Sequence, residues 1–331
     1  MPDVTFAHVP GMKAASQVAE RHADGLSQDE FLSEYVANSR PVVIREAVKH
    51  WPARTKWRDK DYLKRQSGHH RVFAYPHEYL DAKADNEAGK RELSFAEAID
   101  VLHAPETAVG FVGTAMPIEL LPDVGDFRFF SGPVDPAFFY HDIRYFLFRN
   151  AGTTWHYHPM DETLMCQLIG RKRVGFVHTL SPRPHAIRNM FVRGTYYTDP
   201  TAFDGFDNSG HAWFEATLDE GDALYIPPLW WHGVVPLTHD FGVTAPVTWR
   251  SPLPVIADTI RKLAAWGGGL EGVMPPCGAR ALTDVARSLG LAAELQSAAK
   301  QGKLRVQQEA PPNLRSLWRD RAPAGNRAAH A

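Results

Sequence analysis

Between residues 143 and 249 the chain consists of short apolar runs separated by turn-forming residues. The runs are rich in β-branched and aromatic side chains and are broken by Gly, Pro, Asn and Asp, as in IRYFLFRNAG, RKRVGFVHT, HAWFEATLDEGDALYIPP and DFGVTAPVTW. Several strands at such short spacing are typical of antiparallel sheets that pack as a sandwich or close into a barrel. We therefore predict a mainly β core in this part of the chain.

Helices and further strands are expected before this core. Residues 27–30 (SQDE) and 94–97 (SFAE) match the capping box, in which a serine and a glutamate three residues later satisfy the first N–H groups of a helix. WRDKDYLKRQ at 57–66 has the pattern of an amphipathic helix. Short strand-like runs lie at 41–44, 71–75 and 108–115. The N-terminal half is therefore predicted to mix helices with strands.

The sequence after Pro254 becomes helical in pattern again. VIADTIRKLAAW carries apolar residues at helical spacing and ends at a triple glycine, and TDVARSLGLAAELQSAAK has the pattern of a second helix. The last stretch is rich in Pro, Arg and Ala, which is typical of a frayed terminus. We divide the chain into an N-terminal arm, a main domain, a C-terminal helical region and a flexible tail, at residues 1–26, 27–253, 254–306 and 307–331.

Composition and charge exclude several classes of protein. The formal net charge is −2, so nothing draws the whole chain to nucleic acid or to an anionic membrane surface. Two cysteines, Cys166 and Cys277, do not form the disulfide framework of a small secreted protein. The first residues lack the basic and apolar segments of a signal peptide, and no run approaches the ~20 apolar residues of a membrane helix. We expect a cytoplasmic protein.

Three histidines in the predicted core form a candidate metal site. His156 and His158 are two residues apart, and on a strand such residues point to the same face of the sheet. His232 follows the apolar run LYIPP and comes from another strand. Three imidazoles on one inner face can hold a transition metal and leave open positions, as in non-haem iron oxygenases. The H-x-H pair alone is weak evidence, because 16 histidines produce such pairs by chance, and both could lie on a solvent-facing strand.

The remaining histidines and the cysteine of the core show no such pattern. We expect surface or structural roles for His69, His70, His178, His185, His211 and His239. Cys166 falls on a predicted strand and is expected to fill the core rather than to act as a nucleophile.

The segments around the three histidines resemble the metal-binding halves of JmjC and cupin-like hydroxylases of the asparaginyl-hydroxylase type. GTTWHYH with QLIGRKRV resembles the first half and EGDALYIPPLWWHGVV the second, while PVVIREAVKHWPARTKWRDKDYL and RELSFAEAIDVL resemble the family's N-terminal region. The resemblance implies a mainly β fold with flanking helices, in which a double-stranded β-helix (cupin or jelly-roll) core lies between N-terminal α/β elements and C-terminal helices. It implies that residues 27–253 are a JmjC/cupin-like catalytic domain and that 254–306 contain dimerisation helices, so a homodimer is expected.

The resemblance also implies roles for single residues. His156 matches the first iron ligand and His232 the distal one. Lys172, two residues after Gly170, matches the basic residue that pairs with the far carboxylate of 2-oxoglutarate, and Thr153 matches a hydroxyl that bonds the same carboxylate. An ammonium and a hydroxyl together suit a buried carboxylate. Lys172 also lies in an R-K-R run, which is a common pattern of solvated charges.

One position departs from the family pattern. The family has H-x-D, whereas this chain has His158 in place of the aspartate. The change removes a negative charge, so an Fe(II) site would carry about two net positive charges instead of one. Imidazole nevertheless suits iron, zinc, copper and nickel. Classical cupins have a glutamate shortly after H-x-H, and Glu162 stands at that spacing; Asp161 is a further candidate if the loop offers its carboxylate instead of His158.

Three functions are compatible with these residues. In the first, the protein is an oxygenase with Fe(II) on the three histidines, 2-oxoglutarate on Thr153 and Lys172, and dioxygen at an open position. It would hydroxylate a C–H bond of a protein or peptide side chain or of an amino-acid-like small molecule. The second is a three-histidine cupin-type dioxygenase that uses no 2-oxoglutarate, and the third is a non-catalytic metal-binding protein with the same fold. We expect no nucleic-acid or membrane partner.

Overall fold

Two β-sheets that face each other make up most of the structure. The computed structural model describes residues 6, 9–75, 90–107, 110–131, 134, 136–137, 143–158, 161–178 and 210–252. In this part of the chain the helices are α1 (Gln28–Glu30), α2 (Ala53–Lys56), α3 (Lys60–Ser67) and α4 (Phe95–His103), with a π-helical turn η4 (Phe31–Val36) and 3-10 turns η2 (Met12–Ala14), η3 (Ala23–Gly25) and η5 (Ile118–Asp123). The strands are β1 (Ser16–Gln17), β2 (Ala19–His22), β3 (Val42–Arg45), β4 (Arg71–Tyr75), β5 (Arg91–Ser94), β6 (Gly110–Ala115), β7 (Arg144–Arg149), β8 (Thr153–His156), β9 (Asp161–Ile169), β10 (Lys172–His178), β11 (Trp213–Leu218), β12 (Ala223–Ile226), β13 (Trp230–Pro236) and β14 (Phe241–Arg250).

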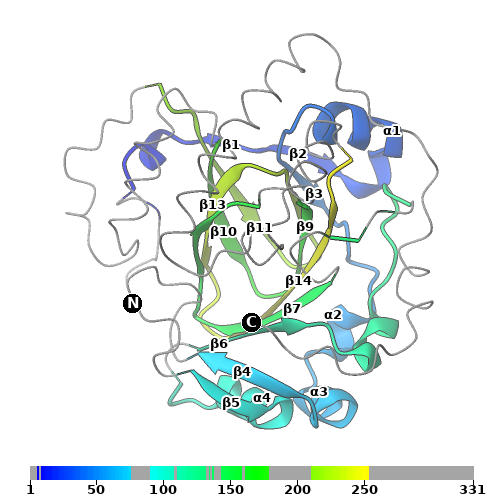
Figure 1. Ribbon diagram of the computed structural model, residues 1–331, viewed down its shortest axis with the longest axis vertical. Helices are drawn as coiled ribbons and strands as arrows, with labels where there is room; N and C mark the ends of the chain where they lie inside the picture. Colours follow the sequence, from blue (N-terminus) through cyan, green and yellow to red (C-terminus); the bar gives the residue numbers. More distant parts are fainter. Residues whose placement is uncertain are drawn as a thin grey trace, which may run out of the picture.

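The chain passes back and forth between the two sheets. The small sheet has the order β1-β11-β10-β13-β8, and the large sheet has the order β2-β3-β12-β9-β14-β7-β6-β4-β5 (Figure 1). Strands β7, β9, β12 and β14 therefore belong to the large sheet, whereas β8, β10, β11 and β13 belong to the small one. The pairs that these eight strands form with one another are antiparallel. This is the topology of a double-stranded β-helix, and it confirms the predicted mainly β, jelly-roll fold class.

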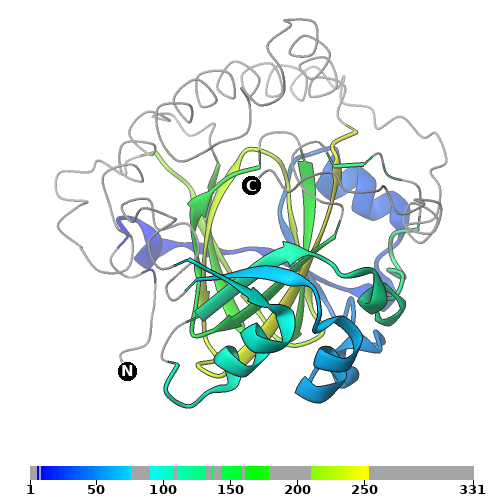
Figure 2. The same cartoon turned by 60° about the horizontal axis from the view of Figure 1, so that its bottom comes forward.

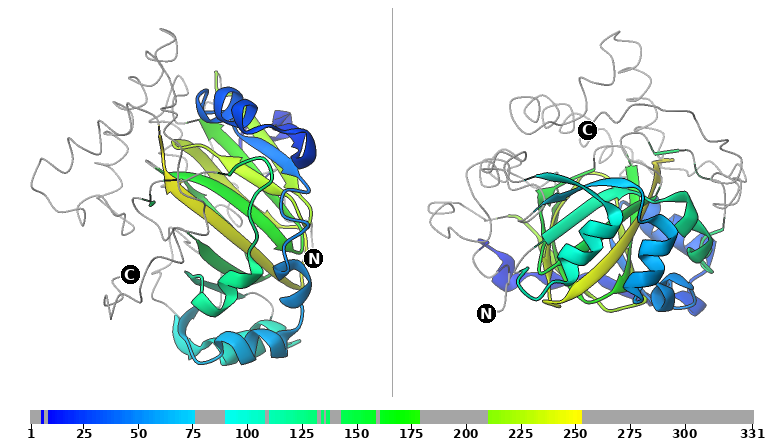
Figure 3. Two further views of the ribbon diagram at one scale, coloured as in Figure 1. Left: turned by 90° about the vertical axis from the view of Figure 1, so that its right-hand side faces the viewer. Right: turned by 90° about the horizontal axis from the view of Figure 1, so that it is seen from below.

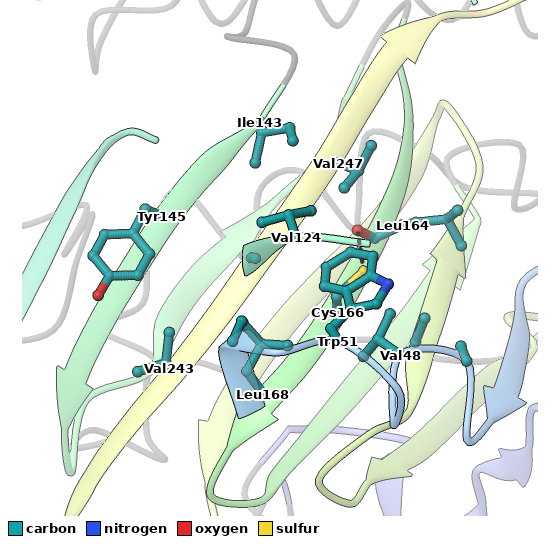
Figure 4. Packing of buried hydrophobic residues seen from close by; sticks show 14 of the residues in the cluster. Val48, Trp51, Val124, Ile143, Tyr145, Leu164, Cys166, Leu168, Val243 and Val247 are labelled. Atoms are coloured by element: carbon teal, nitrogen blue, oxygen red, sulfur yellow. Dashed lines mark hydrogen bonds between the residues drawn. The ribbon is translucent and has the colours of Figure 1, made fainter. Parts of the chain in front are cut away.

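Alternation of side chains along the strands gives the large sheet two buried faces. One side of β9 and β12 meets the small sheet, where Met165 and Leu224 pack with Phe176 and Val234. The other side is covered by the helical elements. Figure 4 shows the packing around Trp51, in which Cys166 and Leu168 come from β9, and Val243 and Val247 come from β14. A second apolar layer therefore covers the face of the large sheet that points away from the small sheet.

The helices after Ser27 and Ser94 begin where the sequence predicts, whereas the helix predicted at 57–66 begins at Lys60. The Ser27 hydroxyl accepts a hydrogen bond from the Glu30 N–H at 3.1 Å, which opens α1. At α4 the capping box is complete, because Ser94 accepts from the Glu97 N–H at 3.2 Å and the Glu97 carboxylate accepts from the Ser94 N–H at 2.7 Å. Helices α3 and α4 pack together across the end of the large sheet that contains β4 and β5 (Figure 2). None of the described helices is long and apolar enough to cross a membrane.

The segment before residue 27 contributes to both sheets. The sequence suggests no regular element there, but β1 pairs in parallel with β11 and β2 pairs in parallel with β3. These strands have only two and four residues, too few for a periodic pattern to appear in the sequence. Figure 3 shows the two sheets from the side and from below. The predicted helices after Pro254, the predicted tail and the proposed dimerisation surface lie outside the described residues.

Trp155 lies against the outer face of the small sheet. A Cβ atom at Gly175 would lie 2.9 Å from the Trp155 ring, and one at Gly233 would lie 2.7 Å from it. Phe6 contacts the same ring, with centroids 5.4 Å apart, and Met12 belongs to the same buried cluster. Glycine at both positions lets the indole approach the backbones of β10 and β13, which fixes the strand that carries His156.

Candidate metal centre

The three predicted histidines come together between the sheets. His156 ends β8, His158 follows it, and His232 lies in β13, directly opposite His156. One ligand atom from each imidazole lies within 4.8 Å of the others. The ring centroids are 4.2 Å apart for His156 and His232, 5.0 Å for His158 and His232, and 5.3 Å for His156 and His158. The cluster thus has the composition and compactness of a three-nitrogen metal site.

A β-bulge places Thr153 on the same face as His156. His232 pairs with His156, but Val234, two residues further along β13, pairs with Thr153, three residues back along β8. One extra residue in β8 accounts for this difference. On a regular strand, residues three apart would face opposite sides. Val234 belongs to the apolar cluster between the sheets, so its cross-strand partner Thr153 also faces that space.

The hydrogen bond of His232 fixes which ring nitrogen can bind a metal. Its Nδ1 lies 2.9 Å from the carbonyl oxygen of Trp230, which can only accept, so Nδ1 carries the proton. In the neutral ring, Nε2 then keeps its lone pair. This Nε2 is buried, and no described residue forms a hydrogen bond with it. A buried nitrogen acceptor of this kind beside two other imidazoles fits a metal ligand.

His158 is held from two sides. Its Nδ1 lies 2.7 Å from the hydroxyl oxygen of Thr163 in β9. The hydroxyl can accept from Nδ1–H, which leaves the lone pair on Nε2. The backbone N–H of Leu229, just before β13, donates to the carbonyl oxygen of His158 at 2.8 Å. Both contacts fix the position of a residue that lies outside a strand.

Replacing Thr163 by valine is expected to weaken metal binding by roughly 10- to 100-fold, the usual cost of losing a hydrogen bond to a ligand imidazole. Valine has the shape of threonine but offers no oxygen to His158. Thr163→Ser keeps the hydroxyl and should bind like the wild type. Anaerobic competition of Fe(II) between protein and a chelator measures the difference. Equal affinities of the valine and serine variants would show that the hydroxyl does not orient the ring.

Burial keeps His158 and His232 neutral. The pKa of His158 lies well below its usual range because burial disfavours the charged ring, and His232 and His156 lower it further. Burial also lowers the pKa of His232, with a smaller contribution from His156. Neutral imidazole is the form that binds metals, so these rings need not lose protons near pH 7 to act as ligands.

Lys172 is a buried cation that also faces the space between the sheets. It begins β10, on the same face as Val174 and Phe176, and only 2 % of its surface is exposed. Its ammonium lies 3.9 Å from the ring centroid of Phe148 and has no ion-pair partner in the described part of the chain. By contrast, Arg171 is exposed and pairs with Asp219. The R-K-R run is therefore not simply a set of solvated charges.

The two alternative carboxylate ligands do not join the cluster. Glu162 accepts hydrogen bonds from the Tyr225 hydroxyl and the Ser251 hydroxyl, both at 2.5 Å. It neighbours Thr163 in β9, so the two side chains point to opposite faces, and Thr163 is the one that meets His158. Burial raises the pKa of Glu162 to about 7. Asp161 is also buried, but the described metal-site cluster comprises only the three histidines.

Arg144 is a residue of this region that the sequence does not reveal. It begins β7, and its charge helps to lower the pKa values of both His158 and His232. Its guanidinium carbon lies 5.1 Å from the ring centroid of Phe146. In the sequence it is one arginine in an aromatic run, and the pairing of β7 with β6, in which Arg144 lies opposite Ala115, places it in the large sheet.

Comparisons with known proteins agree with the fold. The chain matches the family model described as "Cupin-like domain" over residues 27–252. It is 26% identical over 231 residues to Lysine-specific demethylase JMJ30 of Arabidopsis thaliana, covering 66% of this chain and 52% of that protein. It is 26% identical over 246 residues to Bifunctional peptidase and (3S)-lysyl hydroxylase JMJD7 of Homo sapiens, covering 62% of this chain and 76% of that protein. It is 24% identical over 252 residues to tRNA wybutosine-synthesizing protein 5 of Homo sapiens, covering 69% of this chain and 76% of that protein.

The extent of these matches decides what they establish. The chain spans about half the length of the first relatives, such as the 52% covered in JMJ30 and the 53% covered in JmjC domain-containing protein D of Dictyostelium discoideum. The family model, however, covers more than half of this chain, and several relatives carry JmjC names. The predicted resemblance to JmjC and cupin-like proteins is thereby confirmed, and the chain belongs to the cupin-like domain family.

Proposed function

We propose that the protein is a non-haem Fe(II)- and 2-oxoglutarate-dependent oxygenase that hydroxylates a C–H bond. The observation that carries the proposal is the convergence of His156, His158 and His232 in a space that also contains the buried amino group of Lys172, for which the described part of the chain provides no ion-pair partner. Enzymes of this class convert 2-oxoglutarate, dioxygen and R–H into succinate, carbon dioxide and R–OH. One oxygen atom enters succinate, and the other enters the product.

The residues present fit an iron ion. The His232 hydrogen bond leaves Nε2 as the atom that can bind a metal, and that buried atom has no partner among the described side chains and backbone groups. Three protein ligands on one side of an ion leave open positions for a chelating co-substrate and for dioxygen. Bound iron would supply the activation of dioxygen. The apolar side chains Phe176, Val174 and Val234 keep water from this space.

Lys172 and Thr153 are proposed to hold 2-oxoglutarate. Phe176 pairs with His232, and Lys172 lies four residues before Phe176 in β10, which is about 13 Å along a strand. A lysine side chain and a five-carbon dicarboxylate together can bridge that distance. Thr153 and Lys172 pair with Val234 and Pro236, so both lie toward the same end of β13 from His232. The dianion would also offset the charge that three neutral imidazoles leave on the metal.

A second candidate is a three-histidine dioxygenase that needs no 2-oxoglutarate. His158 supports it, because an imidazole stands where a 2-oxoglutarate oxygenase of this family has aspartate. The buried ammonium of Lys172 argues against it, because such a reaction gives this cation no anion to bind. The idea that Glu162 is a fourth ligand receives no support, since its carboxylate is held by Tyr225 and Ser251. A non-catalytic metal-binding protein is the third candidate.

Anaerobic titration of the metal-free protein with Fe(II) and then with 2-oxoglutarate separates the three candidates. Chelation of Fe(II) by a 2-oxo acid produces a visible charge-transfer band, which we expect to appear. Succinate formation after admission of air would then show turnover. Iron binding without a band would favour the second candidate. A band without succinate, even in the presence of peptide substrates, would favour the third.

The substrate is proposed to be a protein or peptide side chain, or a small molecule that resembles an amino acid. The names of three relatives specify lysine or lysyl groups. A peptide array assayed for succinate release in excess of the substrate-free rate is therefore the first screen. The cytoplasm is the proposed compartment, and a homodimer built on residues 254–306 is a proposal that light scattering can test.

A further inference from the structure

A second group of metal-ligating side chains lies outside the jelly roll. His69 and His70 occupy the turn between α3 and β4, and Glu119 lies in η5. The Nε2 atom of His70 lies 2.9 Å from one Glu119 oxygen, and the Nε2 atom of His69 lies 3.8 Å from the other. The two imidazole centroids are 4.2 Å apart, and one ligand atom from each of the three residues lies within 4.8 Å of the others.

The backbone around this cluster is fixed. The His70 N–H donates to the Ser67 carbonyl at 3.1 Å, and the His70 carbonyl accepts from the Phe95 N–H at 2.8 Å. At the end of η5, Asp123 accepts hydrogen bonds from the Trp57 indole at 2.9 Å and the Tyr62 hydroxyl at 2.7 Å. The turn and η5 are already formed and hold the three side chains together before any ion binds. A ligand would therefore find the site largely preorganised.

We propose that His69, His70 and Glu119 bind a divalent late transition metal, for which Zn²⁺ is the model ion. Zinc takes exactly this mixture of imidazole nitrogen and carboxylate oxygen, with water at a fourth position. Ligand atoms about 2.0 Å from a tetrahedral ion lie about 3.3 Å from each other. The Glu119 carboxylate presents one oxygen to each imidazole, at 2.9 and 3.8 Å, and the three ligand atoms lie within 4.8 Å of one another, so side-chain rotations can bring them to that spacing. Glu119 supplies the negative charge that the central three-histidine cluster lacks.

Another exposed histidine–glutamate pair shows what distinguishes this cluster. His22 Nε2 lies 3.0 Å from a Glu46 oxygen, almost the same distance as in the His70–Glu119 pair. There, however, only one imidazole is present, and the ammonium of Lys49 also binds the Glu46 carboxylate. At Glu119 a second imidazole takes the place of the competing cation. A bound ion would tie the turn after α3 to η5 and thereby stiffen the helical layer at the end of the large sheet.

The test compares how many equivalents of Zn²⁺ the metal-free full chain binds in calorimetric titrations. Glu119→Gln and His69→Ala should each bind one equivalent fewer than the wild type. His156→Ala/His232→Ala, which removes the central cluster, should lose a different equivalent and retain the one that depends on Glu119. Glu46→Gln is the matched control and should bind as many equivalents as the wild type.

Thermal unfolding gives an independent measurement. In the His156→Ala/His232→Ala background, Zn²⁺ should raise the melting temperature, and adding Glu119→Gln should abolish that shift. The proposal is overturned if Glu119→Gln binds as many equivalents as the wild type. It is also overturned if the variant loses an equivalent only together with the central one. Because the central cluster is varied separately, failure of this site leaves the proposed oxygenase function untouched.

Discussion

Replacing Lys172 by methionine is expected to stabilise the ligand-free protein and, at the same time, to abolish its binding of 2-oxoglutarate. Burial lowers the pKa of Lys172 from 10.5 to about 7, a difference that corresponds to roughly 5 kcal/mol of unfavourable desolvation. Methionine removes that cost and keeps an unbranched apolar chain over Phe148. It also removes the cation that would pair with the far carboxylate, so the 2-oxoglutarate affinity should fall by about 100-fold or more.

The pH dependence follows from the same shift in pKa. Below pH 7 Lys172 is charged in both the folded and the unfolded protein, and its full burial cost is present. Between pH 7 and 10.5 the folded protein has released the proton while the unfolded chain still holds it, so this cost diminishes as the pH rises. The stability gained by Lys172→Met should therefore be largest below pH 7 and should vanish near pH 10.5.

Binding of 2-oxoglutarate should show the opposite preference. The dianion needs the charged ammonium, so affinity should be constant below pH 7 and fall by about tenfold per pH unit above it. Binding at pH 8 should take up about 0.9 proton. Calorimetry in buffers of different ionisation enthalpy measures this uptake. Arg171→Met, which alters the exposed neighbour, is the control and should change neither property. Unchanged 2-oxoglutarate affinity in Lys172→Met would exclude this residue as the anchor.

Replacing His232 by alanine is expected to weaken Fe(II) binding by more than ~100-fold, since loss of a ligand costs more than loss of a hydrogen bond to one. The Nε2 atom of His232 is buried and forms no hydrogen bond with the residues that the structure describes, so the change should affect metal binding more than folding. Anaerobic titration of Fe(II) against a competing chelator measures the affinity. His239→Ala removes an exposed imidazole whose Nδ1 lies 2.7 Å from the side-chain oxygen of Asn150, and it should bind like the wild type.

Free imidazole offers a rescue for the same variant. The cavity left in His232→Ala has the shape of an imidazole ring, and its surroundings supply the Trp230 carbonyl as an acceptor. Added imidazole should therefore restore Fe(II) binding in His232→Ala and leave the wild type unaffected. A variant that binds Fe(II) as tightly as the wild type without imidazole would show that His232 is not a ligand.

Local patterns in the sequence were sufficient to predict much of the fold. The Ser27 hydroxyl caps α1, and the full capping box forms at Ser94; both depend on hydrogen bonds within one helical turn. The spacing of His156 and His158 predicts a shared face, and the two imidazoles do converge. These features share one property, which is that the interacting residues are close together in the chain.

Features that depend on pairing between distant segments could not be predicted. The bulge that turns Thr153 toward the space between the sheets arises from the register between β8 and β13. No residue type in β8 predicts this bulge. Lys172 stands between Arg171 and Arg173 in the sequence, and its burial depends on Phe148 in β7. Glu162 has the spacing of a cupin ligand, but the alternation of β9 turns it toward Tyr225 instead. The orientation of each of these three side chains thus depends on strand pairing, which the local sequence does not specify.

The contact of Trp155 with Gly175 and Gly233 has a consequence for how this protein can evolve. Position 155 is adjacent to His156, whereas the two glycines lie on the outside of the small sheet, facing away from the cluster. A side chain added at either glycine must displace the indole, and the displacement is transmitted along the backbone to the neighbouring imidazole. Mutational effects at the three positions should therefore be strongly epistatic. In a directed-evolution library, substitutions on this outer surface are expected to alter metal binding productively only when positions 155, 175 and 233 are varied together.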